Sequence, residues 1–165
     1  MILVPRHPER FADVETLIQK SGLAYVKRTE QTPLSGSTQV LLGDTMGEMM
    51  LLYGLSKVAF VGGSLVKHGG HNPLEPIAFE LPVISGVYTY NFPEIFAKLA
   101  EVKGFVEVNS DTQSLVQAVE FLLENREARK TIATAGFSVL QENQGALERH
   151  LALLAPYLEK NNERN

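Results

Sequence analysis

Residues 62–76, which read G-G-S-L-V-K-H-G-G-H-N-P-L-E-P, hold the densest group of residues suited to binding chemistry. Asn72 is a good helix N-cap and Pro73 a good first helical residue, so we expect a helix to begin there. The N–H groups of a first helical turn carry partial positive charge, and glycine lets a ligand approach the backbone closely. This combination favours an anion, most often a phosphate.

The same segment also has a purely structural interpretation. Asn72 and Glu75 have the spacing of a capping box, in which Glu75 only satisfies the backbone of the N-cap residue, and glycines shape turns. We favour the ligand interpretation because a cap leaves the two histidines and the glycines between them unexplained. Glu75 is then suited to accept hydrogen bonds from vicinal hydroxyls such as a ribose diol, since a carboxylate repels phosphate.

A second candidate segment is the loop of residues 5–10, with the sequence Pro-Arg-His-Pro-Glu-Arg. It places Arg6 directly after the strand-like run 2–4. The Arg6 guanidinium can form two parallel hydrogen bonds to a phosphate or a carboxylate, and His7 can donate to the same group. The alternative is an exposed charged loop shaped by its two prolines.

A third candidate is the segment 43–48, with the sequence G-D-T-M-G-E. Thr45 and Glu48 have capping-box spacing, so the structural interpretation is a simple helix start. Gly47 inside a first helical turn costs about 1 kcal/mol relative to Ala, and its missing side chain opens the backbone to a ligand. Both interpretations stay open for this segment, and Glu48 can serve both.

Other catalytic constellations are not supported. His68 and His71 are accompanied by no third histidine and by no carboxylate at ligand spacing, so we predict no metal site and no cofactor. The sequence has no G-x-S-x-G elbow, and we assign no catalytic residue. His150 is expected to be a surface residue.

The three loops belong to an expected alternation of strands and helices. Short apolar runs predict strands, and apolar residues at helical spacing predict helices. The expected strands are 2–4, 23–27, 40–42, 58–61, 82–85 and 105–108. The expected helices are 9–21, 46–54, 73–80, 92–100, one capped by Asp111 with Leu115, Val119 and Leu122 on its apolar face, 126–142 and 146–158.

Such mostly non-alternating strands predict a parallel sheet covered on both faces, which is an α/β, Rossmann-like doubly wound fold. Loops that follow the carboxyl ends of parallel strands collect at one edge of the sheet, where ligands bind. We therefore expect loops 5–10, 43–48 and 62–75 to lie together.

Composition restricts the remaining possibilities. The 165 residues are 44% hydrophobic and 21% charged, which suits one globular domain over residues 1–160 with a frayed tail at 161–165. Fifteen basic against 19 acidic residues give a net charge of −4, which argues against a general nucleic-acid binder. There is no cysteine and no apolar run of membrane-spanning length. Because a strand-like run begins at once, we expect the chain to be a piece of a longer protein.

Taken together, P-R-H-P-E-R-F, G-D-T-M-G-E-M and F-V-G-G-S-L-V-K-H-G-G-H-N-P-L-E-P resemble, in the same order, the C-terminal half of the 3-deoxy-D-manno-octulosonic acid (Kdo) transferases of lipopolysaccharide biosynthesis. The resemblance implies one half of a GT-B glycosyltransferase, inverting and metal-independent, that takes Kdo from CMP-Kdo to a lipid A precursor. It implies that a missing N-terminal domain binds the lipid acceptor and supplies the catalytic residue. The full-length protein is then associated with the cytoplasmic face of the bacterial inner membrane.

The resemblance also implies which residues contact the CMP part of the donor. They are Pro5, Arg6, Met46, Gly47, Glu48, Asn72, Pro73, Leu74 and Glu75. Two other functions remain open: a UDP-sugar-dependent GT-B transferase or nucleotide-sugar epimerase domain, and a non-catalytic nucleotide- or partner-binding module.

Overall fold

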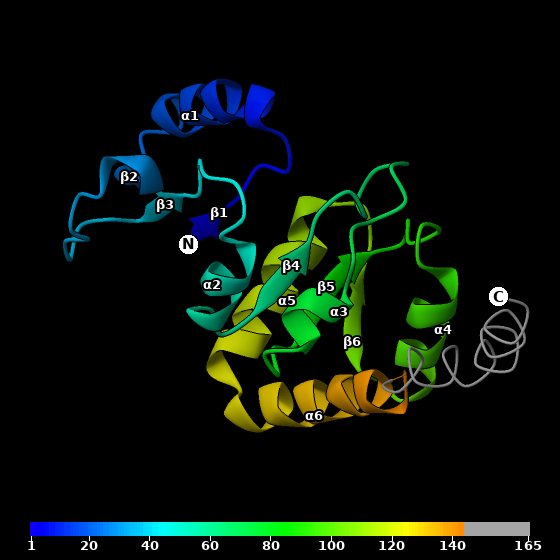
Figure 1. Cartoon of the computed structure of the whole chain (residues 1–165). Helices are drawn as coiled ribbons and strands as arrows, with labels where there is room; N and C mark the ends of the chain where they lie inside the picture. The colour runs from blue at the N-terminus through cyan, green and yellow to red at the C-terminus, as the bar shows by residue number, and fades with distance from the viewer. Residues whose placement is uncertain (144–165) are drawn as a thin grey trace, which may run out of the picture. The chain divides into compact units, whose positions relative to one another are not determined.

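The computed structural model describes residues 1–143, which belong to two compact units (Figure 1). The first unit is Met1–Ser56 and the second begins at Lys57. Each unit has its own three-stranded parallel sheet. The expected helix 146–158, His150 and the tail 161–165 lie outside the described residues.

The first unit has β3 (Val40–Leu42) at the centre of its sheet, between β1 (Ile2–Leu3) and β2 (Tyr25–Lys27). Its helices are α1 (Phe11–Lys20), α2 (Met49–Gly54) and the short 3-10 turns η1 (Pro8–Arg10) and η2 (Arg28–Glu30). Ile18 of α1 packs with Val40 and Leu42 of β3 in a small core. The neighbouring Leu17 is 61% exposed.

The second unit has β5 (Val83–Gly86) between β4 (Ala59–Val61) and β6 (Phe105–Val108). Its helices are α3 (Leu74–Ile77), α4 (Pro93–Glu101), α5 (Thr112–Glu124) and α6 (Arg126–Asn143). Asp111 caps α5 as predicted, because its carboxylate accepts a 2.7 Å hydrogen bond from the Ser114 N–H.

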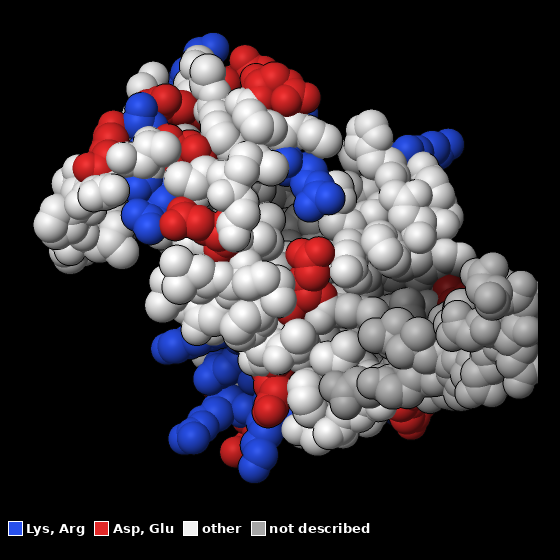
Figure 2. All heavy atoms as spheres, in the orientation of Figure 1, with Lys and Arg blue, Asp and Glu red and all other residues white. Residues whose placement is uncertain are grey.

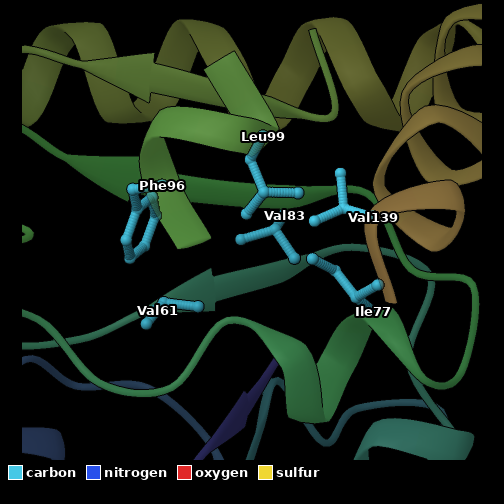
Figure 3. Packing of buried hydrophobic residues seen from close by; sticks show 6 residues of the cluster. All are labelled: Val61, Ile77, Val83, Phe96, Leu99 and Val139. Carbon is cyan, nitrogen blue, oxygen red and sulfur yellow. The ribbon is translucent and has the colours of Figure 1, made fainter. Parts of the chain in front are cut away.

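Both faces of the second sheet are covered, as predicted. Successive residues of a strand point to opposite faces, so Val83 and Ile84 of β5 enter different clusters. Val83 lies in a cluster formed with α3, α4 and α6 (Figure 3). The members of this cluster are Val61, Ile77, Val83, Phe96, Leu99 and Val139. Ile84 packs on the other face against α5, through Ala118 and Leu122.

The predicted α/β class with parallel strands is confirmed. Hydrogen bonding links the six strands as two sheets of three, in the orders β1-β3-β2 and β4-β5-β6, where the sequence suggested one continuous sheet. Each unit is therefore described by itself.

Two helices are shorter than predicted, and the backbone explains both. The predicted helix 73–80 ends at Ile77, because Glu80 takes a left-handed conformation with φ 52°. The N–H groups of Glu80 and Leu81 then bond back to the carbonyls of Ile77 and Pro76, as in a Schellman motif. The predicted helix 46–54 begins only at Met49, because Gly47 has a φ of 82°, which no α-helix allows.

Candidate functional site

Two of the three candidate loops leave the same sheet edge. Strands β1 and β3 are parallel neighbours, so loops 5–10 and 43–48 both start at their carboxyl ends. The Gly43 N–H donates a 2.9 Å hydrogen bond to the carbonyl of Leu3, which continues the ladder to the point where the two loops diverge. The structure thus brings the candidate residues of these two loops to one edge of the first unit. The third loop, 62–75, belongs to the second unit.

Arg6 is free to meet a ligand. Its side chain is exposed, and it makes no hydrogen bond or ion pair with another residue of the described range 1–143. Pro5 is half-buried, and Pro8 starts the turn η1 directly afterwards. Pro5 and Pro8 restrict the backbone on either side of Arg6. A guanidinium without a partner on such a restricted loop is suited to binding a phosphate.

Glu48 is held by two partners. Its Oε1 accepts a 2.8 Å hydrogen bond from Arg28 Nη2, and its Oε2 accepts one from the Thr45 hydroxyl. The hydrogen bond from Thr45, opposed by partial burial and reinforced by Arg28, lowers the pKa of the Glu48 carboxyl below its ordinary value. The capping-box interpretation, one of the two left open for this segment, is therefore wrong, since the carboxylate of Glu48 bonds to these side chains and caps no backbone group of α2. Sequence reasoning missed Arg28, which lies 20 residues before Glu48 in the chain.

A second acid ties the same loop to the turn η2. The two oxygens of Asp44 accept hydrogen bonds from the backbone N–H and the hydroxyl of Thr29. Burial raises the pKa of Asp44, but the hydrogen bonds from Thr29, a hydrogen bond from the Asp44 backbone and the charge of Lys27 together leave the pKa below its ordinary value. Asp44 and Glu48 thus fasten loop 43–48 to residues 28 and 29.

Between these two anchors the loop leaves its backbone open. Gly47 has a φ of 82°, a left-handed conformation that favours glycine, and no atom lies within 4 Å of the place where its Cβ would be. The prediction that Gly47 lies inside the first turn of a helix is wrong, because it precedes α2. The neighbouring Met46 is 63% exposed. A ligand can therefore approach the backbone at this point.

In the third loop, Asn72 bonds to the start of α3 and Glu75 does not cap. The side-chain oxygen of Asn72 accepts a 3.0 Å hydrogen bond from the Leu74 N–H, but α3 begins at Leu74 and its N-cap is the buried Pro73, one residue later than predicted. Within residues 1–143 the half-buried Glu75 carboxylate makes no hydrogen bond or ion pair. The capping-box interpretation of Glu75 is therefore wrong, and its carboxylate is available to a ligand.

The glycines of this loop, in contrast, have a structural reason that the sequence did not reveal. Gly69 and Gly70 have φ values of 84° and 72°. A Cβ on Gly69 would clash with the side-chain oxygen of Asn91 and lie 2.6 Å from a ring carbon of Tyr90. Asn91 Nδ2 donates to the carbonyls of His68 and Gly70 at 2.9 and 3.0 Å. These glycines therefore do not by themselves argue for a ligand.

The start of α3 is a weaker anion site than the sequence suggested. This helix has four residues, so its macrodipole is small. Few N–H groups of its first turn are left for an anion, because the Leu74 N–H already donates to the Asn72 side chain and Pro76 has no N–H. A phosphate bound here needs a further positive group.

Between residues 1 and 143, no group of three or more metal-ligating side chains could hold a metal ion. No helix of that range is both long and apolar enough to cross a bilayer.

Comparison with known proteins agrees with the loop motifs. Residues 20–139 match the family of glycosyl transferases group 1. The chain is 57% identical over 161 residues to the 3-deoxy-D-manno-octulosonic acid transferase of Haemophilus influenzae, and 35% identical over 159 residues to that of Bordetella pertussis. These matches cover 98% and 96% of this chain but 38% and 37% of the relatives, so the chain spans little more than a third of their length.

A solved structure is similar over most of both chains. It is described as the crystal structure of the C-terminal CMP-Kdo binding domain of WaaA from Acinetobacter baumannii. The identity is 38% and the TM-score 0.81, and the match covers 85% of this chain and 72% of that one. The chain thus belongs to the glycosyl transferases group 1, as a homologue of the C-terminal domain of the 3-deoxy-D-manno-octulosonic acid transferases.

Proposed function

We propose that this chain is the donor-binding part of an inverting, metal-independent transferase that moves Kdo from CMP-Kdo to a lipid A precursor. The observation that carries the proposal is the 38% identity and TM-score of 0.81 with a domain described as binding CMP-Kdo. The 57% identity to the Haemophilus influenzae transferase supports the same sugar.

In the proposed reaction, an acceptor hydroxyl attacks the anomeric carbon of Kdo while the bond from that carbon to the CMP phosphate oxygen breaks. The electron pair of that bond goes to the phosphate, whose negative charge grows in the transition state. Preorganised donors stabilise such charge most effectively. Arg6 is an exposed cation of the first unit with no partner among residues 1–143, and it is suited to this task.

The remaining predicted contacts fit the nucleoside. Glu75 has a free carboxylate for the two ribose hydroxyls, and Gly47 leaves backbone open beside Met46 and Glu48. Asn72, Pro73 and Leu74 shape the turn that presents Glu75.

The acceptor and the group that takes its proton belong, in this proposal, to the part of the relatives that this chain does not span. The whole protein would then work at the cytoplasmic face of the bacterial inner membrane, where it meets its lipid acceptor.

Calorimetric titration of the chain with CMP and with UMP tests the proposal. Saturable binding of CMP, tighter than that of UMP, is expected. Tighter binding of UMP would instead indicate a UDP-sugar enzyme, and binding of neither nucleotide would indicate a non-catalytic module.

A further inference from the structure

We propose that Arg28 and Glu48 together recognise the cytosine base of the donor, and that Arg28 is a specificity-determining residue. The inference rests on the proposed function, because it assigns the base of the same nucleotide. Arg28 lies in none of the three candidate loops, and only the folded chain brings it to Glu48.

The geometry provides a donor and an acceptor side by side. Arg28 Nη2 and Glu48 Oε1 are 2.8 Å apart, and both side chains keep access to solvent, with exposed fractions of 34% and 29%. This contact uses one of the five guanidinium N–H groups of Arg28. Each carboxylate oxygen of Glu48 can accept a second hydrogen bond beyond the one from Arg28 or Thr45. The pair can therefore bind a further group that offers a donor next to an acceptor.

The hydrogen-bonding edge of cytosine has this pattern. Its exocyclic amine donates, and the adjacent ring nitrogen and carbonyl accept, so the amine fits Glu48 and the acceptors fit Arg28. Uracil has the reverse pattern, with a carbonyl in place of the amine and a ring N–H in place of the acceptor. A uracil carbonyl facing the Glu48 carboxylate would bring two acceptors together. If the rest of the site holds both bases in the same position, the pair therefore favours cytosine over uracil.

The position of the pair supports contact with a base. Glu48 follows Gly47 and Met46, where the backbone is open. Arg28 also lines a hollow of about 420 Å³ in the first unit. The other residues that line this hollow are Lys27, Gln31, Thr32, Leu34 and Leu41. The Arg28 side chain is therefore accessible from this hollow, which Glu48 does not line.

Thr45 and Arg28 also keep the acceptor in the required state. The Thr45 hydroxyl and the Arg28 guanidinium both favour the ionised form of Glu48 and fix its orientation. Without Arg28, the carboxylate would lose one of its two anchors as well as the neighbouring donor.

The chain contains a closely matched control. Glu15 on α1 is also held by a hydroxyl, that of Tyr25 at 2.8 Å, and by a cation, Lys27, at 3.3 Å. It lies outside the three candidate loops. Glu15→Gln therefore removes the same charge from the same kind of pair while Arg28 and Glu48 keep their own contacts.

The test is the ratio of CMP to UMP dissociation constants, measured by calorimetry on the 165-residue chain and its variants. A bidentate base contact of this kind discriminates by roughly 10- to 100-fold, so we expect such a preference for CMP in the wild type. Glu48→Gln and Arg28→Gln should both reduce the ratio to within about threefold of unity. Arg28→Lys should retain part of the preference for CMP that Arg28→Gln loses. Glu15→Gln should have the same preference as the wild type. Thermal unfolding monitored by circular dichroism identifies any variant that does not fold.

The outcomes separate the two proposals. A wild-type preference for CMP that persists in folded Glu48→Gln and Arg28→Gln would overturn the base-recognition role while leaving the donor-binding function intact. Binding of CMP and UMP with equal affinity would do the same. A wild-type chain that binds no CMP would overturn both proposals.

Discussion

Arg6 and Glu75 are the two charged candidate side chains that have no partner within residues 1–143. Glu48, the third, is tied to Arg28 and Thr45. An exposed or half-buried charge with no structural partner adds little to stability, so its presence in a polar loop favours a role in binding.

We expect Arg6→Ala and Glu75→Ala each to weaken CMP binding by about 1.5 to 3 kcal/mol, the usual contribution of a hydrogen bond to a charged group. The melting temperature should change little, because neither side chain has a partner to lose. Calorimetry and thermal unfolding of the same preparations check both statements. Glu101→Ala, an exposed acid at the end of α4, serves as the control. Unchanged CMP affinity in folded Glu75→Ala would reject its role as a ribose acceptor.

Asp44 should make stability depend on pH. The pKa of Asp44 is lower in the folded chain than its ordinary value of 3.8. The ionised carboxylate therefore adds to the free energy of unfolding above pH 3.8, and this stabilisation disappears as the pH falls through the lower pKa of the folded state. Asp44→Asn should therefore lower the free energy of unfolding at pH 7 by about 1 kcal/mol, a figure reduced for solvent exposure. Denaturant unfolding at pH 7 and pH 3 should show this difference shrinking in acid. A difference independent of pH would show that the Asp44 charge is not responsible.

The sequence identified residues that belong to local motifs and missed those that act across the chain. Asn72 and Asp111 were recognisable because a cap contacts a backbone group two or three residues away. Arg28 and Asn91 were not, since their partners lie 20 to 23 residues distant and only tertiary folding brings them together.

At the scale of elements, the six strands appear where apolar runs predicted them, because burial on both faces of a sheet demands such runs. The errors concern element ends, where backbone conformation outweighs side-chain pattern. Glu80 ends α3 in a left-handed conformation that glycine usually supplies, so no sequence signal marked that end. The start of α2 was misplaced because Gly47 was assigned a helical conformation.

Loop 62–75 is held in place by the segment that follows β5. In addition to the two hydrogen bonds from the Asn91 side chain, the Asn91 backbone N–H donates a 3.0 Å hydrogen bond to the carbonyl of Gly69. The Tyr90 hydroxyl donates a 2.7 Å hydrogen bond to the carbonyl of Lys67. At the root of the loop, the buried Ser64 hydroxyl accepts a 2.8 Å hydrogen bond from the Gly86 N–H. Loop 62–75, which follows β4, and the segment that follows β5 are therefore joined in one hydrogen-bonded network.

Asn91→Ala should loosen this network, because it removes two hydrogen bonds of about 1 kcal/mol each. We expect faster hydrogen exchange at the amides of Gly70 and His71, which bond to Gly63 and Gly62, and a several-fold loss of CMP affinity. Asn109→Ala, at an exposed position before α5, is the matched control. Unaltered exchange in Asn91→Ala would mean that the backbone bonds alone hold the loop.

At the scale of the whole molecule, charge and family membership agree. The net charge is −4, and Figure 2 shows acidic and basic side chains interspersed on the visible face of the first unit. Such a surface lacks the uniform positive field that attracts nucleic acids.

We expect the purified chain to bind CMP but to transfer no Kdo. The chain spans about 38% of the Haemophilus influenzae transferase, and in the proposed function the acceptor site and the catalytic base belong to the remainder. Incubation with CMP-Kdo and a lipid A precursor, followed by mass spectrometry of the lipid, measures transfer. A full-length relative is the positive control, and product formed by this chain alone would contradict the division of labour.

The bracing of loop 62–75 by Tyr90, Asn91 and Ser64 has a thermodynamic consequence. A loop that is already ordered by internal hydrogen bonds loses little conformational entropy when a nucleotide binds to it. Association then avoids most of the entropy loss that accompanies folding upon binding. The enthalpy of CMP association should then vary only slightly between 10 and 35 °C, with roughly the small negative heat-capacity change of a preformed pocket.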